Sequence, residues 1–268
     1  MTIRTFVSDD VPRFLALAAA EGWTSDPWEF DFLLEHFPGG CLTLEEGGKA
    51  QAFVTALPHG TSGWIGNLIV APDARGRGYG TLLMERAMDE LLAAGVTTVW
   101  LTASLAGRPI YERMGFREID QVARWSGRGR GQGERGDLIP LGRMVAMDRA
   151  GWGDVREPLL SAVVSRGSLL GGADGFLVVQ PCGSGVQLGP WSCGDRGEAS
   201  SLLGRVIGPA ADEIPVILDV PVRNGAAAAL LTAAGFSTVG RTALMYAGVV
   251  PAYDPTRIFA LASMGSMG

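Results

Sequence analysis

Hydrophobic and polar positions in the first half of the chain indicate both helices and strands. After Ser8 or Asp9, apolar side chains recur every three or four positions, which predicts a capped amphipathic helix. Residues 27–37 predict a second helix that ends at a Pro-Gly-Gly sequence. Three β-rich stretches separated by glycine-rich turns then predict an antiparallel meander at residues 41–46, 51–59 and 64–72.

The remaining elements of this half complete an α/β pattern. A strand is expected at residues 3–7, and a glycine-rich loop at 74–80 opens a third helix. A strand, a short helix and a final β-rich stretch follow at residues 97–104, 107–114 and 117–125. The order βααβββαβαββ predicts an α/β domain in which the loop joins the fourth strand to the third helix.

Weak internal repeats indicate two copies of this domain. The sequence YERMGF at 111–116 recurs as LTAAGF at 231–236, and VARWSG recurs as TALMYAG. We therefore predict an N-terminal domain at residues 1–127, a Gly/Arg-rich linker at 128–137 and a degenerate C-terminal copy at 138–268.

Composition narrows the classes of function. The formal net charge of −6 argues against a general nucleic-acid-binding protein. The three cysteines are widely spaced and form neither a disulfide framework nor a metal-ligand pattern, which favours a reducing cytoplasm. No stretch approaches the roughly 18 apolar residues of a membrane span. We expect a cytoplasmic protein with no metal site and with neither nucleic acid nor membrane as a partner.

The loop before the third helix has the chemistry of an anion site. A helix N-terminus leaves backbone N–H groups unpaired and carries a partial positive charge. Glycines at 76, 78 and 80 let the backbone approach a ligand closely, and Arg75 and Arg77 add charge or hold the loop. The pattern predicts a phosphate or pyrophosphate ligand, with a tight strand-to-helix turn as the structural alternative.

The segment 65–91 resembles the acyl-CoA-binding motif of the GNAT superfamily of N-acetyltransferases, Arg/Gln-x-x-Gly-x-Gly/Ala, which is met by Arg75, Gly78 and Gly80. The sequence IYERMGF is similar to the Tyr-x-x-x-Gly-Phe element of that family. The resemblance implies acetyl-CoA as co-substrate. The implied cofactor-binding residues are Leu68, Ile69, Val70, Arg75, Gly76, Arg77, Gly78, Tyr79, Gly80, Thr81 and Ser104.

The resemblance also implies the fold of each copy, and it indicates which copy binds CoA. Each copy is expected to be an α/β (α+β) GNAT-like domain with a mixed, mostly antiparallel sheet flanked by helices. The second copy lacks the loop motif and has Leu231 where the first has Tyr111. Asp195 and Glu198 stand near its corresponding helix start, where we expect them to cap that helix. We expect no CoA site in this copy.

Tyr111 stands where the family places its general acid, so it is the candidate that protonates the departing thiolate; the alternative is an ordinary core tyrosine. A backbone N–H near Leu68 to Val70, at a bulge in the fourth strand, is expected to stabilise the oxyanion. Ser104 departs from the family's usual Asn. No residue stands out as general base among Glu21, Asp26, His36 and His59, and Asn67 could position a water or the amine.

The sequence thus predicts an acyl-CoA-dependent N-acyltransferase that moves an acetyl group from acetyl-CoA to the primary amine of a small molecule by direct attack. The second copy would close the acceptor site. The first two helices, with Trp23, Trp28, Phe30 and Phe32, would cover it, and ordinary core packing is the equal alternative for these aromatics. The alternative is a catalytically silent acyl-CoA-binding protein with a regulatory or partner-binding role.

Overall fold

The computed structural model describes residues 1–105, 107–130, 139–208 and 213–268. The chain forms two compact units. Unit 1 comprises Met1–Leu101, Ala247–Val249 and Gly265–Met267, and unit 2 comprises Thr102–Tyr246, Val250–Met264 and Gly268. Each unit therefore contains a segment from the other half of the sequence.

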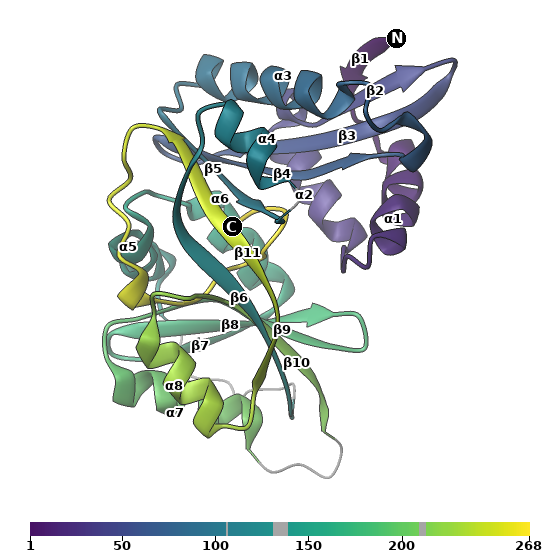
Figure 1. Ribbon diagram of the computed structural model, residues 1–268. Helices are drawn as coiled ribbons and strands as arrows, with labels where there is room; N and C mark the ends of the chain where they lie inside the picture. The colour runs from purple at the N-terminus through teal and green to yellow at the C-terminus, as the bar shows by residue number, and fades with distance from the viewer. Residues whose placement is uncertain (106, 131–138, 209–212) are drawn as a thin grey trace. The chain divides into compact units, whose positions relative to one another are not determined.

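Unit 1 has the element order that the sequence predicts (Figure 1). Its sheet runs β1-β2-β3-β4-β5, with antiparallel pairs up to β4 and a parallel β4–β5 pair. The strands are β1 (Thr2–Thr5), β2 (Leu42–Glu46), β3 (Lys49–Pro58), β4 (Ser62–Val70) and β5 (Thr98–Ala103). The helices are α1 (Val11–Ala20), α2 (Pro27–His36) and α3 (Tyr79–Ala93), with the short 3-10 turns η1 (Ser8–Asp10), η2 (Pro38–Gly40) and η3 (Pro72–Ala74).

An aromatic cluster packs α1 and α2 onto one face of this sheet. The ring of Phe14 lies 4.7 Å from that of Phe30 and 5.9 Å from that of Phe53, and Phe6 stacks on Phe30 at 5.2 Å. All four side chains are buried, and each contributes roughly 2–3 kcal/mol of apolar burial. Two of the four predicted acceptor-side aromatics, Phe30 and Phe32, are thus buried.

Helix α3 covers the opposite face of the sheet. A Cβ placed on Gly63 of β4 would lie 2.8 Å from a methyl group of Leu91 in α3. At the other end of the helix, a Cβ on Gly80 would lie 3.6 Å from Val70 and 4.0 Å from Leu68. The side chains of Leu68 and Val70 therefore point toward α3.

Unit 2 repeats the same pattern. Its sheet runs β11-β6-β10-β9-β8-β7, and β12 pairs with β9. The strands are β6 (Arg117–Gly129), β7 (Ser168–Gly171), β8 (Gly175–Cys182), β9 (Gly185–Cys193), β10 (Ile214–Pro221), β11 (Ser237–Gly248) and β12 (Ile258–Ala260). The helices are α4 (Arg108–Arg113), α5 (Leu141–Trp152), α6 (Glu157–Arg166), α7 (Arg196–Ile207), α8 (Gly225–Ala233) and the turn η4 (Pro255–Arg257). The two GNAT-like copies and their mostly antiparallel sheets are confirmed.

The predicted boundary at residue 127 would assign strand β6 to the first copy, but in the structure β6 lies between β10 and β11 (Figure 1). The guanidinium of Arg124 in β6 binds both carboxylate oxygens of Asp219 in β10, each at 2.8 Å. Asp219 is fully buried, and Gln187 of β9 also donates to it at 3.2 Å. This buried pair fixes β6 in the sheet of unit 2.

The chain also returns to unit 1 near its C-terminal end. The amide of Val249 donates to Thr97 O at 3.0 Å, and the hydroxyl of Thr98 donates to Val249 O at 2.8 Å. The compact units thus follow contacts in space, whereas the boundaries at 127 and 138 follow the sequence repeat and stay a prediction. Of the predicted linker, Arg128 and Gly129 lie in β6, and residues 131–137 lie outside the described residues.

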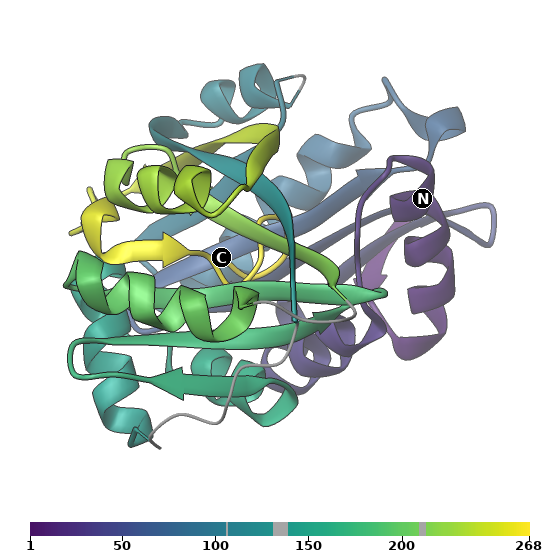
Figure 2. The ribbon, with the colours of Figure 1, turned by 90° about the horizontal axis from the view of Figure 1, so that it is seen from below.

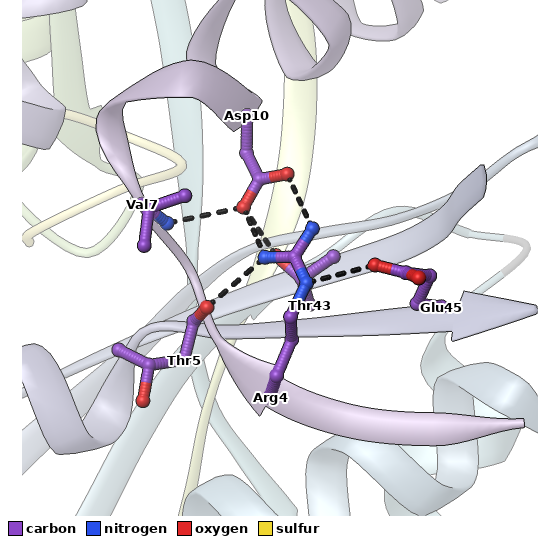
Figure 3. Close-up of polar contacts among 6 residues, drawn as sticks. All are labelled: Arg4, Thr5, Val7, Asp10, Thr43 and Glu45. Carbon is purple, nitrogen blue, oxygen red and sulfur yellow. Dashed lines mark hydrogen bonds and ion pairs between the residues drawn. The ribbon is translucent and has the colours of Figure 1, made fainter. Parts of the chain in front are cut away.

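A buried carboxylate ties the start of unit 1 together (Figure 3). Arg4 of β1 donates to both oxygens of Asp10 at 2.6 and 2.9 Å, and the Val7 amide and Thr43 hydroxyl donate at 3.0 and 3.1 Å. Burial alone would raise the pKa of Asp10, but the Arg4 guanidinium and these two donors outweigh it and hold the pKa below its ordinary value.

Asp10→Asn is expected to lower the free energy of unfolding by about 1–3 kcal/mol at pH 7, because it removes the charge from this site. Since the folded pKa lies below the unfolded one, the contribution of Asp10 is complete above the unfolded pKa of about 4 and is lost as the pH falls through the folded pKa. Urea unfolding at pH 7 and at successively lower pH should show the gap between wild type and variant closing. The exposed neighbour provides the control, Asp9→Asn. A gap that is independent of pH would contradict the assignment.

Candidate functional site

The loop between β4 and α3 owes its shape to two glycines in the left-handed region. Gly76 has φ 76° and Gly78 has φ 80°, and Gly78 is the residue that precedes α3. A residue with a Cβ is destabilised by about 1 kcal/mol or more in this conformation. No atom lies within 4 Å of a Cβ placed at either position, so the backbone here faces open space.

The N-terminus of α3 has the properties of an anion site. Gly78 offers no side chain to the first turn, and within the described residues no side chain caps this helix. The first amide with a helical partner is that of Leu82, which donates to Gly78 O at 3.1 Å. The amides of Tyr79, Gly80 and Thr81 therefore precede the helical hydrogen bonds and remain available to a ligand.

Both loop arginines hold the loop. Arg75 donates to Val70 O at 3.1 Å and pairs with Glu21 at the end of α1. Arg77 binds both oxygens of Glu46 at 2.5 and 2.7 Å and lies 4.7 Å over the ring of Tyr79. The Arg77 guanidinium lowers the pKa of Glu46, and Glu46 in turn raises the pKa of Arg77. The sequence left open whether these arginines add charge for a ligand or hold the loop. In this structure, their hydrogen bonds hold the loop.

Strand β4 carries a bulge at Asn67, close to the predicted position. Phe53 pairs with Ile69 and Thr55 pairs with Gly66, so two residues of β4 oppose one of β3. Asn67 has φ 55° and is the one non-glycine residue with positive φ among the described positions. Its side chain donates to the Thr55 hydroxyl at 3.2 Å.

The sheet opens between β4 and β5 after Trp64, ahead of this bulge. The parallel register of β4 with β5 covers only Ser62–Trp64 and Thr98–Trp100. The end of β4, with Leu68 to Val70, is therefore unpaired with β5 and continues directly into the glycine loop. The structure brings together in unit 1 the predicted residues from Leu68 to Thr81.

Tyr111 and Ser104 lie in unit 2, at the start of α4. The Ser104 hydroxyl accepts from the Gly107 amide at 3.2 Å. A Cβ on Gly107 would lie 3.2 Å from the Tyr111 ring and 3.4 Å from the Ser104 hydroxyl oxygen, so these residues are neighbours. Burial raises the pKa of Tyr111 to about 12, which keeps its phenol protonated at neutral pH. Its ring packs edge-on against Phe116 at 6.1 Å.

Three of the candidate bases have structural partners. Glu21 pairs with Arg75, and Asp26 accepts from the Trp28 amide at 2.9 Å as the cap of α2. His36 donates from Nδ1 to Phe32 O at 2.9 Å, so its ring is held along α2. No pattern along the chain indicates that Glu21 and Glu46 pair with the loop arginines, because these partners are distant in the sequence.

The corresponding opening in unit 2 is filled by the chain itself (Figure 2). The parallel register of β9 with β10 ends at Leu188 and Leu218, and β12 then pairs with β9. Leu261, directly after β12, donates to Asp219 O of β10 at 2.8 Å. Asn224, which retains the family's Asn in the second copy, donates to Ile258 O of β12 at 2.9 Å. Sequence reasoning missed β12, although residues 258–262 form an apolar run.

Asp195 caps α7 as predicted, because its side chain accepts from the Glu198 amide at 2.8 Å. The Glu198 side chain does not take the predicted capping role and instead accepts from the Asp174 amide at 2.7 Å. The Asp195 carboxylate thus occupies the place at which an anion would bind. Over residues 1–105, 107–130, 139–208 and 213–268, no group of His, Cys, Asp and Glu is arranged to hold a metal ion. None of the helices in these ranges has the length and hydropathy to cross a membrane.

Comparison with known proteins agrees with this geometry. Residues 9–116 match the model of the Acetyltransferase (GNAT) family, and residues 144–260 match that of an Acetyltransferase (GNAT) domain. The uncharacterized N-acetyltransferase MJ1207 of Methanocaldococcus jannaschii is 29% identical over 148 residues, which cover 46% of this chain and 64% of that protein. The chain thus spans less than two thirds of that relative.

Two further matches extend the comparison. The ribosomal protein bS18-alanine N-acetyltransferase of Haemophilus influenzae is 32% identical over 101 residues, which cover 35% of this chain and 67% of that protein. The crystal structure of a proposed acetyltransferase from Pyrococcus horikoshii has the same fold, with a TM-score of 0.84, 21% identity and coverage of 100% of this chain and 95% of its own. The chain therefore belongs to the GNAT family of acetyltransferases, and each half of its sequence is of GNAT type.

Proposed function

We propose that this protein is an acyl-CoA-dependent N-acyltransferase that moves the acetyl group of acetyl-CoA to the primary amine of a small molecule. One observation carries the proposal: within unit 1, the uncapped N-terminus of α3, opened by Gly76 and Gly78, follows the last residues of β4, Leu68 to Val70, which are unpaired with β5. A diphosphate fits the first feature, and an extended arm with amide groups fits the strand edge of Leu68 to Val70.

The chemistry is direct transfer. The neutral amine attacks the thioester carbon and forms the C–N bond, and a backbone N–H of the segment Leu68 to Val70 stabilises the oxyanion. When the C–S bond breaks, Tyr111 protonates the leaving thiolate, a role that rests on its place in the Tyr-x-x-x-Gly-Phe element. The amine nitrogen loses a proton to solvent, and Tyr111 regains its own proton from solvent.

A release assay for free thiol, with acetyl-CoA and a panel of small amines, tests this function. Thiol release that depends on both substrates, with an acetylated amine as product, is the expected result. The Haemophilus influenzae relative is named for a protein substrate, so a peptide α-amine belongs in the panel. Binding of CoA without turnover on any amine would instead support the silent regulatory alternative, which the engaged side chains of Glu21, Asp26 and His36 favour.

Gly78→Asp is expected to weaken CoA binding at least about tenfold, because it places a carboxylate at the amides that would hold the diphosphate. The matched control is Gly95→Asp, at the other end of α3, where φ is 87° and a Cβ also meets open space. Both variants should lose about 1 kcal/mol of stability. Calorimetric titration should give one equivalent of CoA for wild type and for the control. A second equivalent, or one that survives Gly78→Asp, would contradict a single site at this loop.

Tyr111→Phe is expected to lower the turnover rate about 10²-fold while the affinity for acetyl-CoA changes little, because one hydroxyl is lost and the ring remains. The control Tyr253→Phe removes a hydroxyl that donates to Asp120 at 3.0 Å and should affect stability alone. Steady-state kinetics that place Tyr111→Phe within about twofold of wild type would make Tyr111 an ordinary core residue.

A further inference from the structure

A segment from the end of the described chain lies against the bulge of β4. Gly265 O accepts from the amide of Asn67 at 3.2 Å. A Cβ placed on Gly66 would lie 2.5 Å from Gly265 O, 2.6 Å from Ser266 O and 2.8 Å from Ser266 Cα. Glycine at position 66 is therefore what allows the backbone of Gly265–Met267 to approach the strand this closely.

The segment lies on the sheet face opposite α3. Gly63 faces Leu91 of α3, and three positions later in a strand the side-chain direction is reversed, so Gly66 faces the other way. That is the face where Phe53, the pairing partner of Ile69, meets Phe14 of α1. The glycine loop and the side chains of Leu68 and Val70 all belong to the α3 face.

The segment is firmly held. Ser266 and Met267 expose only 3% and 1% of their surfaces. Just before it, Met264 O accepts a hydrogen bond from the Thr102 hydroxyl. A backbone anchored in this way is a fixed boundary beside the bulge.

We propose that Gly265–Met267 is the wall of the acceptor site that restricts acceptors to short amines and excludes extended peptides. This inference rests on the proposed function, in which the loop on the α3 face takes the CoA diphosphate, and it further proposes that the amine approaches from the opposite face. An extended peptide binds a free strand edge through backbone hydrogen bonds. The backbone N–H of Asn67 already donates to Gly265 O, so a peptide cannot bond to it. A short amine needs no hydrogen bond to the strand backbone.

The test compares kcat/KM for a small primary amine with kcat/KM for a peptide α-amine. Gly66→Ala should displace the segment, since its methyl group would overlap Gly265 O. Met267→Ala should loosen the same segment without changing β4. Gly265→Ala is the matched control, because its methyl group meets open space. Circular-dichroism melting confirms that each variant is folded.

We expect the peptide-to-small-amine ratio to rise at least about tenfold in Gly66→Ala and in Met267→Ala and to stay within about twofold in Gly265→Ala. Unchanged ratios in active variants would contradict the proposal that Gly265–Met267 excludes peptides, but they would not contradict the acetyltransferase function. A wild-type protein that prefers the peptide would also overturn the proposed wall. Absence of thiol release with every amine, for all four proteins, would remove the proposed function and the wall together.

Discussion

Strand β6 is paired along both of its edges, and the sheet of unit 2 depends on these two pairings. It pairs with β10 over eight positions on one side and with β11 on the other. The carboxylate of Asp219 is buried beneath this pairing and needs Arg124 as its counter-ion. A buried carboxylate without its cation costs several kcal/mol, so β6 cannot leave the sheet without a large penalty. The sheet of unit 2 is therefore completed by a strand that precedes all of its other strands in the sequence.

Much of the fold and part of the site follow from local signals in the sequence. Asp195 caps the helix that it was expected to cap, and the glycine loop predicted before α3 is present, with Gly76 and Gly78 in the left-handed region. The bulge lies at Asn67, next to the residues named for it. These features depend on a few neighbouring residues, which is why a pattern along the chain suffices to predict them.

The pairings between distant segments could not be predicted. Alternation along residues 117–129 shows which side chains share a face, but it does not identify the strands on either edge. The same limit applies to β12 and to Gly265–Met267, whose positions depend on contacts with β9 and with Gly66. Glu21 and Glu46 were missed as partners of the loop arginines for this reason as well.

The two openings in the sheets show how one architecture supports different outcomes. In unit 1, β4 parts from β5 after Trp64 and leads into a glycine loop whose helix has no side-chain cap among the described residues. In unit 2, β9 parts from β10 after Leu188, yet β12 enters the opening and Asn224 bonds to it. The absent loop motif and the inserted strand are two independent physical reasons to expect cofactor binding in the first copy alone.

The position of β6 also has a consequence for synthesis on the ribosome. Arg124 and its partner Asp219 are separated by 95 residues, so β6 emerges well before either strand that will flank it. At the roughly 5–20 residues per second of translation, the edge that pairs with β10 stays unpaired for about 5 to 20 seconds, and the edge that pairs with β11 stays unpaired for longer. During that time β6 is open to pairing with other nascent chains, and a chain that stalls before residue 214 cannot protect it.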